Sequence, residues 1–206
     1  MSSVPEPGES AGLSFSRELT RKGLHLISAA IPIAYAAGLA RRSLVLVLVC
    51  GLAAAVVVEV TRWRSRRARA AFELGVGSLL RDHERTVVSG ATWLMLALLI
   101  AVSFFPRDIA VAAMCAVSLG DAAAAVVGRG LRRSSPSQRK SLAGSAACFA
   151  ASVMAARIIA NLAWREAILT GVLASAAERP RRPLDDNVRI VVAVGCGILL
   201  WRMGFS

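Results

Sequence analysis

Long apolar runs constrain the fold of this chain more than any other feature of its sequence. A helix needs about 20 apolar residues to cross the hydrocarbon core of a bilayer, with a range of roughly 17–25. Runs near this length recur along most of the chain, at 24–40, 43–60, 87–105, 109–127, 141–160, 163–177 and 188–201. Their residues do not alternate between apolar and polar as those of membrane-spanning strands do. The sequence therefore predicts an all-α fold, a polytopic transmembrane helical bundle of about seven spans.

The runs at 163–177 and 188–201 are short, so six spans with one re-entrant helix is the alternative. The composition agrees with a membrane protein, since 56% of the 206 residues are hydrophobic and the mean hydropathy is +0.59. Residues 1–16 are polar, without the basic start and apolar run of a signal peptide. We expect a disordered tail there and a single transmembrane domain over 17–206. The four cysteines stand singly, so neither a disulfide framework nor a zinc site is predicted.

Arginine and lysine are distributed unevenly between the loops, and this distribution predicts the orientation. Basic clusters lie before the first run and in the loops 61–86, 128–140 and 178–187. Because cytoplasmic loops are enriched in Lys and Arg, we expect the N-terminus and these loops in the cytoplasm. The net charge of +12 suits an anionic leaflet, so nucleic acid is not expected as a partner. The segment 62–80 predicts either a helix lying in the membrane interface or an ordinary solvated loop.

Carboxylates gather at the predicted cytoplasmic ends of the apolar runs. The candidate metal ligands are Asp121, Glu178, Asp185 and Asp186, with Asn187 beside the last pair. Ionisable groups inside membrane segments are costly, and they mark a candidate functional site. Mg²⁺ is usually bound by one or two carboxylates together with substrate phosphates. For any single carboxylate, a helix cap or a pair with an arginine is the alternative.

The start of the run at 141–160 is a candidate phosphate site. Only two lysines occur among the 25 basic residues, and one of them, Lys140, directly precedes Ser141 there. The free N–H groups and positive dipole end of a helix N-terminus suit a phosphate. The alternative for Lys140 is an interfacial anchor. Gly128 and Gly144 would let the backbone approach either a phosphate or a neighbouring helix.

A polar stripe leads into the first apolar run. Glu18, Arg21, Lys22 and His25 fall at helical spacing. His25 is a candidate general base toward a hydroxyl group, and a hydrogen bond to a neighbouring helix is the alternative. The P-loop, the protein-kinase signatures, the G-x-S-x-G elbow and H-E-x-x-H are all absent from the sequence.

Several short pieces occur in a defined order along the chain. They are Glu18-Leu19-x-Arg21-Lys22-x-x-His25, Glu59-x-x-Arg62, Arg81-x-x-Glu84, Ser89-Gly90-Ala91-Thr92-Trp93, Gly120-Asp121-Ala122-x-Ala124-x-x-x-Gly128-Arg129, Lys140-Ser141-Leu142-Ala143-Gly144-Ser145, and Glu178 with Asp185-Asp186-Asn187. In this order and spacing the chain resembles the small integral-membrane CTP-dependent lipid kinases. That family includes dolichol kinase, phytol kinase, related prenol kinases and the CTP-using diacylglycerol kinase of yeast, and it is related to the CDP-diacylglycerol synthases.

The resemblance implies transfer of the γ-phosphate of CTP to the hydroxyl of a membrane lipid alcohol, with Mg²⁺ or another divalent cation. The implied catalytic residues are Asp121, His25 and Lys140. The implied metal ligands are Asp121, Glu178, Asp185 and Asp186. The implied nucleotide-binding residues are Lys22, Arg21, Gly120, Gly128, Arg129, Lys140, Ser141, Gly144 and Asn187.

The short chain is similar in length to the phytol and prenol kinase members, which favours an isoprenoid alcohol as substrate. A CTP-dependent diacylglycerol kinase and a cytidylyltransferase are the alternatives of the same class. A small ion-coupled transporter or a scaffold protein is the alternative of another class. The expected location is the plasma membrane of a prokaryote, with the active site facing the cytoplasm. The oligomeric state is left open.

Overall fold

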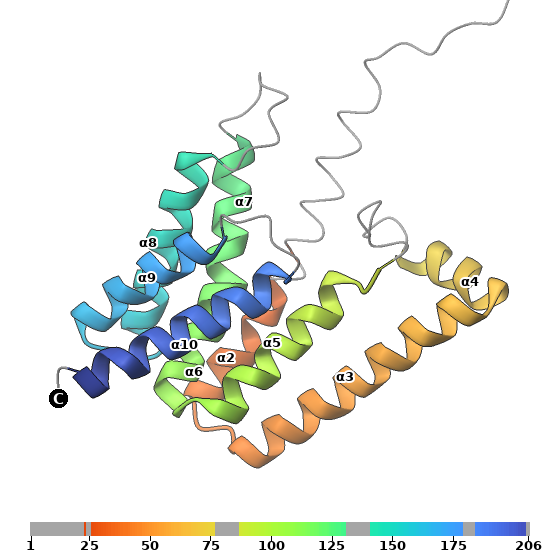
Figure 1. Ribbon diagram of the computed structural model, residues 1–206, viewed down its shortest axis with the longest axis horizontal. Coiled ribbons are helices and arrows are strands. Elements are labelled where there is room, and N and C mark those ends of the chain that lie inside the picture. Colours follow the sequence, from red (N-terminus) through yellow and green to blue (C-terminus); the bar gives the residue numbers. More distant parts are fainter. Residues whose placement is uncertain (1–22, 24–25, 77–86, 131–140, 179–183, 205–206) are drawn as a thin grey trace, which may run out of the picture.

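The computed structural model describes residues 23, 26–76, 87–130, 141–178 and 184–204 of the chain. Within these ranges all regular structure is helical and no strand occurs. The elements in chain order are α2 (Ala30–Ala36), α3 (Arg41–Arg64), α4 (Arg66–Val76), α5 (Gly90–Phe104), α6 (Arg107–Cys115), the π-helical turn η3 (Ala116–Gly120), α7 (Asp121–Gly130), α8 (Leu142–Ile158), α9 (Trp164–Glu178) and α10 (Asp186–Gly204) (Figure 1). The all-α class is confirmed for this part of the chain.

Three of the described helices are long and apolar enough to cross a membrane: Arg41–Arg64, Arg107–Gly128 and Asp186–Gly204. The apolar helices Leu26–Ala36, Gly90–Phe104 and Leu142–Ile158 are shorter. At 1.5 Å per residue, a helix of about 15 residues reaches roughly 23 Å, less than the roughly 30 Å of a hydrocarbon core. Three points stay predictions: that these shorter helices cross the membrane, that the spans total seven, and that the N-terminus is cytoplasmic.

The helix formed by α6, η3 and α7 is the centre of the bundle. It packs against α2, α5, α8, α9 and α10. Of its most apolar stretch of 18 residues, 78% is buried. Every residue from Ile109 to Val117 is at most 1% exposed. This stretch is rich in alanine, and small side chains allow neighbouring helices to approach closely.

Helix α3 lies at the edge of the bundle, beside α5 (Figure 1). Only 17% of its most apolar stretch of 18 residues is buried. The shorter α4 follows at an angle to α3 (Figure 1) and carries polar and apolar residues on different faces. The prediction of a helix within 62–80 is confirmed for Arg66–Val76, and its contact with a membrane surface stays a prediction.

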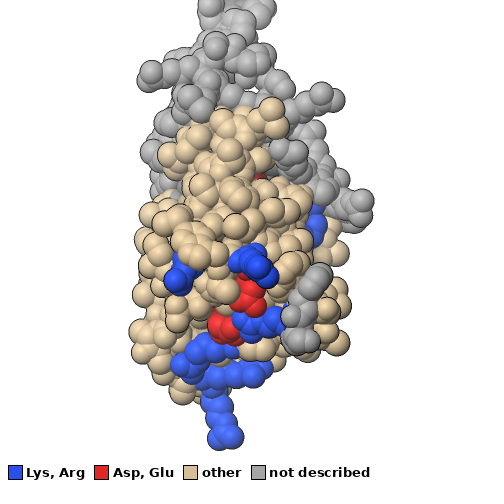
Figure 2. Space-filling view, turned by 90° about the vertical axis from the view of Figure 1, so that its left-hand side faces the viewer, with Lys and Arg blue, Asp and Glu red and all other residues tan. Residues whose placement is uncertain are grey.

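Polar contacts fix one end of the bundle, here called the Arg202 end. Arg202 of α10 donates to Glu166 of α9 through Nε (2.6 Å to Oε1) and to Asp108 of α6 (2.6 Å to Oδ2). Arg107 donates to the carbonyl of Leu39 at 3.2 Å. Figure 2 shows acidic side chains among basic ones low on a mostly uncharged face. Because the helices alternate in direction, the ends of α3, α7 and α9 and the starts of α5, α8 and α10 lie at the opposite end.

Candidate functional site

Asp121 is the predicted carboxylate that lies on the central helix of the bundle. It begins α7 directly after η3 and is 8% exposed. The hydrogen-bond pattern widens by one residue in a π-helical turn, and such turns are frequent at functional sites. Ser118 of η3 is fully buried and hydrogen-bonds Ser28 across 2.9 Å between the two Oγ atoms. This bond holds the segment that begins α2 against the turn that precedes Asp121.

Glycine lets α8 approach the turn that carries Asp121. A Cβ atom on Gly120 would lie 2.5 Å from Ser152 Oγ and 3.3 Å from Cys148 Sγ. Both of these α8 residues are fully buried. The space toward which a side chain at this position would point is therefore filled by α8. A contact between Gly120 and a nucleotide stays a prediction.

Gly128 and Gly144 face each other where α7 crosses α8. A Cβ atom on Gly144 would lie 2.9 Å from the carbonyl oxygen of Ala124 and 3.3 Å from Gly128 Cα. A Cβ atom on Gly128 would lie 3.0 Å from Ser141 Oγ. Of the two alternatives for this pair, approach to a neighbouring helix is the one found. Its use for a phosphate stays a prediction.

Asp121 and Glu178 are brought together around α8. Glu178 ends α9 and is 5% exposed. The charges of Glu178 and Asp121 both act on the buried thiol of Cys148, and Ser152 lies one helical turn after Cys148 on α8. Asp121, Cys148, Ser152 and Glu178 form one buried polar group, which we call the Asp121–Glu178 cluster. Burying two carboxylates among apolar helices costs free energy unless they are partnered.

The acidic run before α10 has a structural role. Asp185 Oδ1 accepts hydrogen bonds from the backbone N–H of Asn187 at 2.9 Å and from its Nδ2 at 2.7 Å. This arrangement is a helix N-cap, so the capping alternative is found for Asp185. Asp186 is half-buried in the first turn, and Asn187 is 4% exposed.

Ser141 also caps a helix. Its Oγ accepts a hydrogen bond from the N–H of Gly144 at 3.0 Å. One of the free donors at the start of α8 is therefore already used by the protein. A phosphate at this position would have the remaining N–H groups of the first turn.

The four predicted metal ligands are not gathered into one group. Among the residues that the structure describes, no three Asp, Glu, His or Cys side chains are arranged to hold a metal ion. Asp121 and Glu178 are the two whose charges act on the same side chain, Cys148. Two carboxylates still fit Mg²⁺, because this ion commonly keeps waters and substrate phosphates as its other ligands.

Several predicted residues fall outside the described part of the chain. They are Arg21, Lys22, His25, Lys140 and the side chain of Arg129. Their predicted roles toward phosphate and hydroxyl therefore stay predictions.

A second buried polar group was given no role by the sequence. Glu59 and Arg62 of α3 are 4% and 3% exposed and form an ion pair, with Arg62 Nε 2.6 Å from Glu59 Oε2. Glu59 Oε1 accepts from the backbone N–H of Ser89, the N-cap of α5, at 2.9 Å. Arg62 also donates to the carbonyl of Val87 at 2.6 Å, and its guanidinium lies 5.1 Å from the ring centre of Phe72.

This group joins α3, α4 and the start of α5. The sequence signal was present, because Glu59-x-x-Arg62 places two opposite charges one helical turn apart beside an apolar run. Which residue would accept or donate across the bundle could not be read from that spacing.

Comparison with known proteins finds no matching family model and no matching solved structure. Curated relatives do match. One is "CTP-dependent diacylglycerol kinase 1" of Eremothecium gossypii, 32% identical over 119 residues, which are 57% of this chain and 38% of the relative. Another is "CTP-dependent diacylglycerol kinase 1" of Saccharomyces cerevisiae, 36% identical over 81 residues, which are 38% of this chain and 28% of the relative. The matched stretches thus span less than half the length of either relative, and over them this chain is similar to proteins named as lipid kinases.

Proposed function

We propose that this chain is a membrane enzyme that transfers the γ-phosphate of CTP to the hydroxyl of a membrane lipid alcohol. The observation that carries the proposal is the Asp121–Glu178 cluster, two buried carboxylates within an apolar bundle whose charges both act on Cys148. Such a placement is costly for a scaffold and is useful for a site that handles a charged substrate at a membrane. The printed names of the two relatives support CTP as donor and a lipid as acceptor.

Phosphoryl transfer depends mainly on positioning and on neutralising charge. Asp121 and Glu178 would hold Mg²⁺, which neutralises the triphosphate when bound, and Asp186 would approach it from the start of α10. Lys140 and the open N–H groups at the start of α8 would bind phosphate oxygens. Arg21, Lys22 and Arg129 would add positive charge there.

The reaction exchanges one P–O bond for another. The lipid oxygen bonds to the γ-phosphorus while the bond between that phosphorus and the bridging oxygen breaks, and CDP leaves. The proton of the hydroxyl passes to His25 or to one carboxylate of the Asp121–Glu178 cluster. The transferred group ends as a lipid phosphate monoester.

The acceptor lipid has two candidates. The names of the relatives favour diacylglycerol, and the second candidate is an isoprenoid alcohol of the phytol, prenol or dolichol kind, which the resemblance to the wider lipid kinase family implies. We also propose that the protein lies in the plasma membrane of a prokaryote and that its active site faces the cytoplasm.

The test uses purified protein in detergent, CTP labelled in the γ-phosphate, and a panel of lipid alcohols that includes diacylglycerol and isoprenoid alcohols. We expect label in the lipid fraction with one acceptor class preferred. Label from α-labelled CTP in that fraction would mean cytidylyl transfer instead. No labelled lipid with any acceptor would reject an enzyme of this kind and favour the transporter alternative.

Asp121→Asn tests the site itself. Removing one charge-stabilising group from an active site commonly lowers kcat by about 10²–10³-fold, and we expect a loss of this size. The matched control is Asp108→Asn, which changes a carboxylate at the Arg202 end and should keep near-normal turnover. Equal activity in both variants would remove Asp121 from the mechanism.

A further inference from the structure

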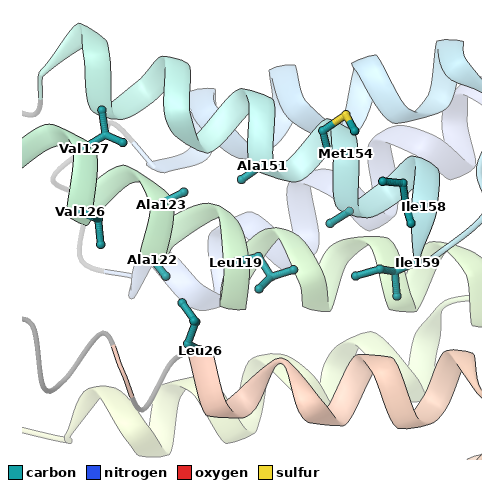
Figure 3. Close-up of a pocket in the computed structure, with 11 residues that line it drawn as sticks. Leu26, Leu119, Ala122, Ala123, Val126, Val127, Ala151, Met154, Ile158 and Ile159 are labelled. Carbon is teal, nitrogen blue, oxygen red and sulfur yellow. The ribbon is translucent and has the colours of Figure 1, made fainter.

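An apolar groove runs along the central helix on the side of α8. Its volume is about 570 Å³, and each lining residue is Ala, Val, Leu, Ile or Met. Figure 3 shows side chains from η3 and α7, from α8, and Leu26 from the segment before α2 around one space. The groove extends from Val126 past Ala151 to Ile158. Its volume lies within the range of ligand sites, roughly 300–1,000 Å³.

The groove lies beside Asp121. Leu119 and Ala122, which flank Gly120 and Asp121 in the chain, both line it. Ala151, on the facing wall, directly precedes Ser152 of the Asp121–Glu178 cluster. A molecule in the groove would therefore contact residues that are adjacent in the chain to Gly120, Asp121 and Ser152.

The surroundings of the groove determine the chemistry of its occupant. It runs along Arg107–Gly128, one of the helices long and apolar enough to cross a membrane. Its rim is open, with Met154 49% and Ile158 68% exposed. A lining without polar side chains offers nothing to a headgroup or to water, whereas it can bury methylene groups at about 0.8 kcal/mol each. Where this helix crosses the hydrocarbon core of a bilayer, the molecules available to fill the groove are hydrocarbon chains.

We propose that this groove binds one hydrocarbon chain of the lipid alcohol and so places its hydroxyl at the turn that carries Asp121. The proposal rests on the proposed function, because it identifies how the acceptor of that reaction is held. The far part of the groove, toward Ile158, receives the chain end that is remote from the hydroxyl. Chain length and branching, rather than the headgroup alone, then contribute to acceptor choice.

Filling the groove tests the proposal through kinetics. Ala151→Phe places a ring in the middle of the groove, and Ala150→Phe adds the same ring at an exposed neighbouring position on α8 that does not line it. We expect Ala151→Phe to raise KM for a long-chain acceptor about tenfold, which corresponds to lost burial of roughly two methylene groups. KM for CTP and turnover of a short-chain, water-soluble alcohol should be unchanged. Equal KM values in the two variants would overturn the proposal while leaving wild-type kinase activity intact.

A second readout does not depend on turnover. Benzoylphenylalanine replaces Met154 in the groove or, as control, Val172 on α9, which is exposed to the same extent, 48% against 49%. With purified protein and a radiolabelled long-chain alcohol without CTP, we expect saturable photocapture at position 154 and only weak, unsaturable capture at position 172. Equal capture at both positions, or a covalent dimer at position 154, would overturn the proposal. The wild-type protein could transfer no phosphate while the variant with benzoylphenylalanine at position 154 captures the alcohol. In that case the lipid site stands and the kinase function fails.

Discussion

Gly120→Ala distinguishes two roles proposed for Gly120, which are close packing against α8 and contact with the substrate. A methyl group there would lie 2.5 Å from Ser152 Oγ, well inside van der Waals contact. Ser152 is fully buried, so its hydroxyl can move only into other packed atoms. Overpacking of this kind costs about 1–3 kcal/mol, whereas replacing glycine by alanine inside a helix gains about 1 kcal/mol. The single variant should therefore lose up to about 2 kcal/mol of stability.

The Ser152→Ala background provides the decisive comparison. Without the hydroxyl the main clash is gone, and only Cys148 Sγ at 3.3 Å remains close. Gly120→Ala should then be neutral or stabilising by up to about 1 kcal/mol, the helix-propensity term alone. The coupling between the two substitutions is thus about 1–3 kcal/mol.

The assay is thermal unfolding of the four proteins in detergent, read as loss of monodisperse protein on size exclusion. A change of 1 kcal/mol moves Tm by about 2–4 °C for a chain of this size. Phosphate transfer from CTP is measured on the same samples. If close packing is the main role of Gly120, the double variant regains both Tm and transfer. The same drop in Tm in both backgrounds would refute the packing argument, and recovered Tm without recovered transfer would show that the backbone at Gly120 contacts the substrate.

The remaining predictions concern the other close contacts. Gly144→Ala meets the backbone carbonyl of Ala124 at 2.9 Å, which cannot move without α7, so it should lower Tm more than Gly120→Ala does; Gly51→Ala, which meets only the flexible end of a methionine, is the matched control and should change Tm little. Arg62→Met leaves the buried Glu59 carboxylate without its cation, and it should cost about 3–5 kcal/mol of unfolding free energy. Glu59→Leu combined with Arg62→Met should recover part of that loss, and a double-mutant cycle that shows strict additivity would contradict the buried ion pair.

The candidate site was predicted only in part. The sequence placed Asp121 and Glu178 at the same end of the bundle, since both follow from alternation of the apolar runs and from the basic loops. It did not distinguish a cap from a ligand, because an Asx residue before a helix serves either purpose. The hydrogen bonds of Asp185 to Asn187 and of Ser141 to Gly144 reveal the caps.

The amino-acid sequence alone determined the helical class, the order of the helices and several of their starting points. These follow from the apolar runs, from glycines and from the Ser and Asp residues that precede helices. Each of these is a local property, since backbone hydrogen bonds inside a helix join residues four apart. The position of each helix in the bundle was decided only by tertiary structure. Helix α3 has the higher mean hydropathy, 2.7 against 1.9 for Arg107–Gly128, and yet it is the exposed one. Lipid is as apolar as leucine, so hydropathy does not drive a helix into the centre of a membrane bundle. Close packing of small side chains does, and it depends on which helices meet.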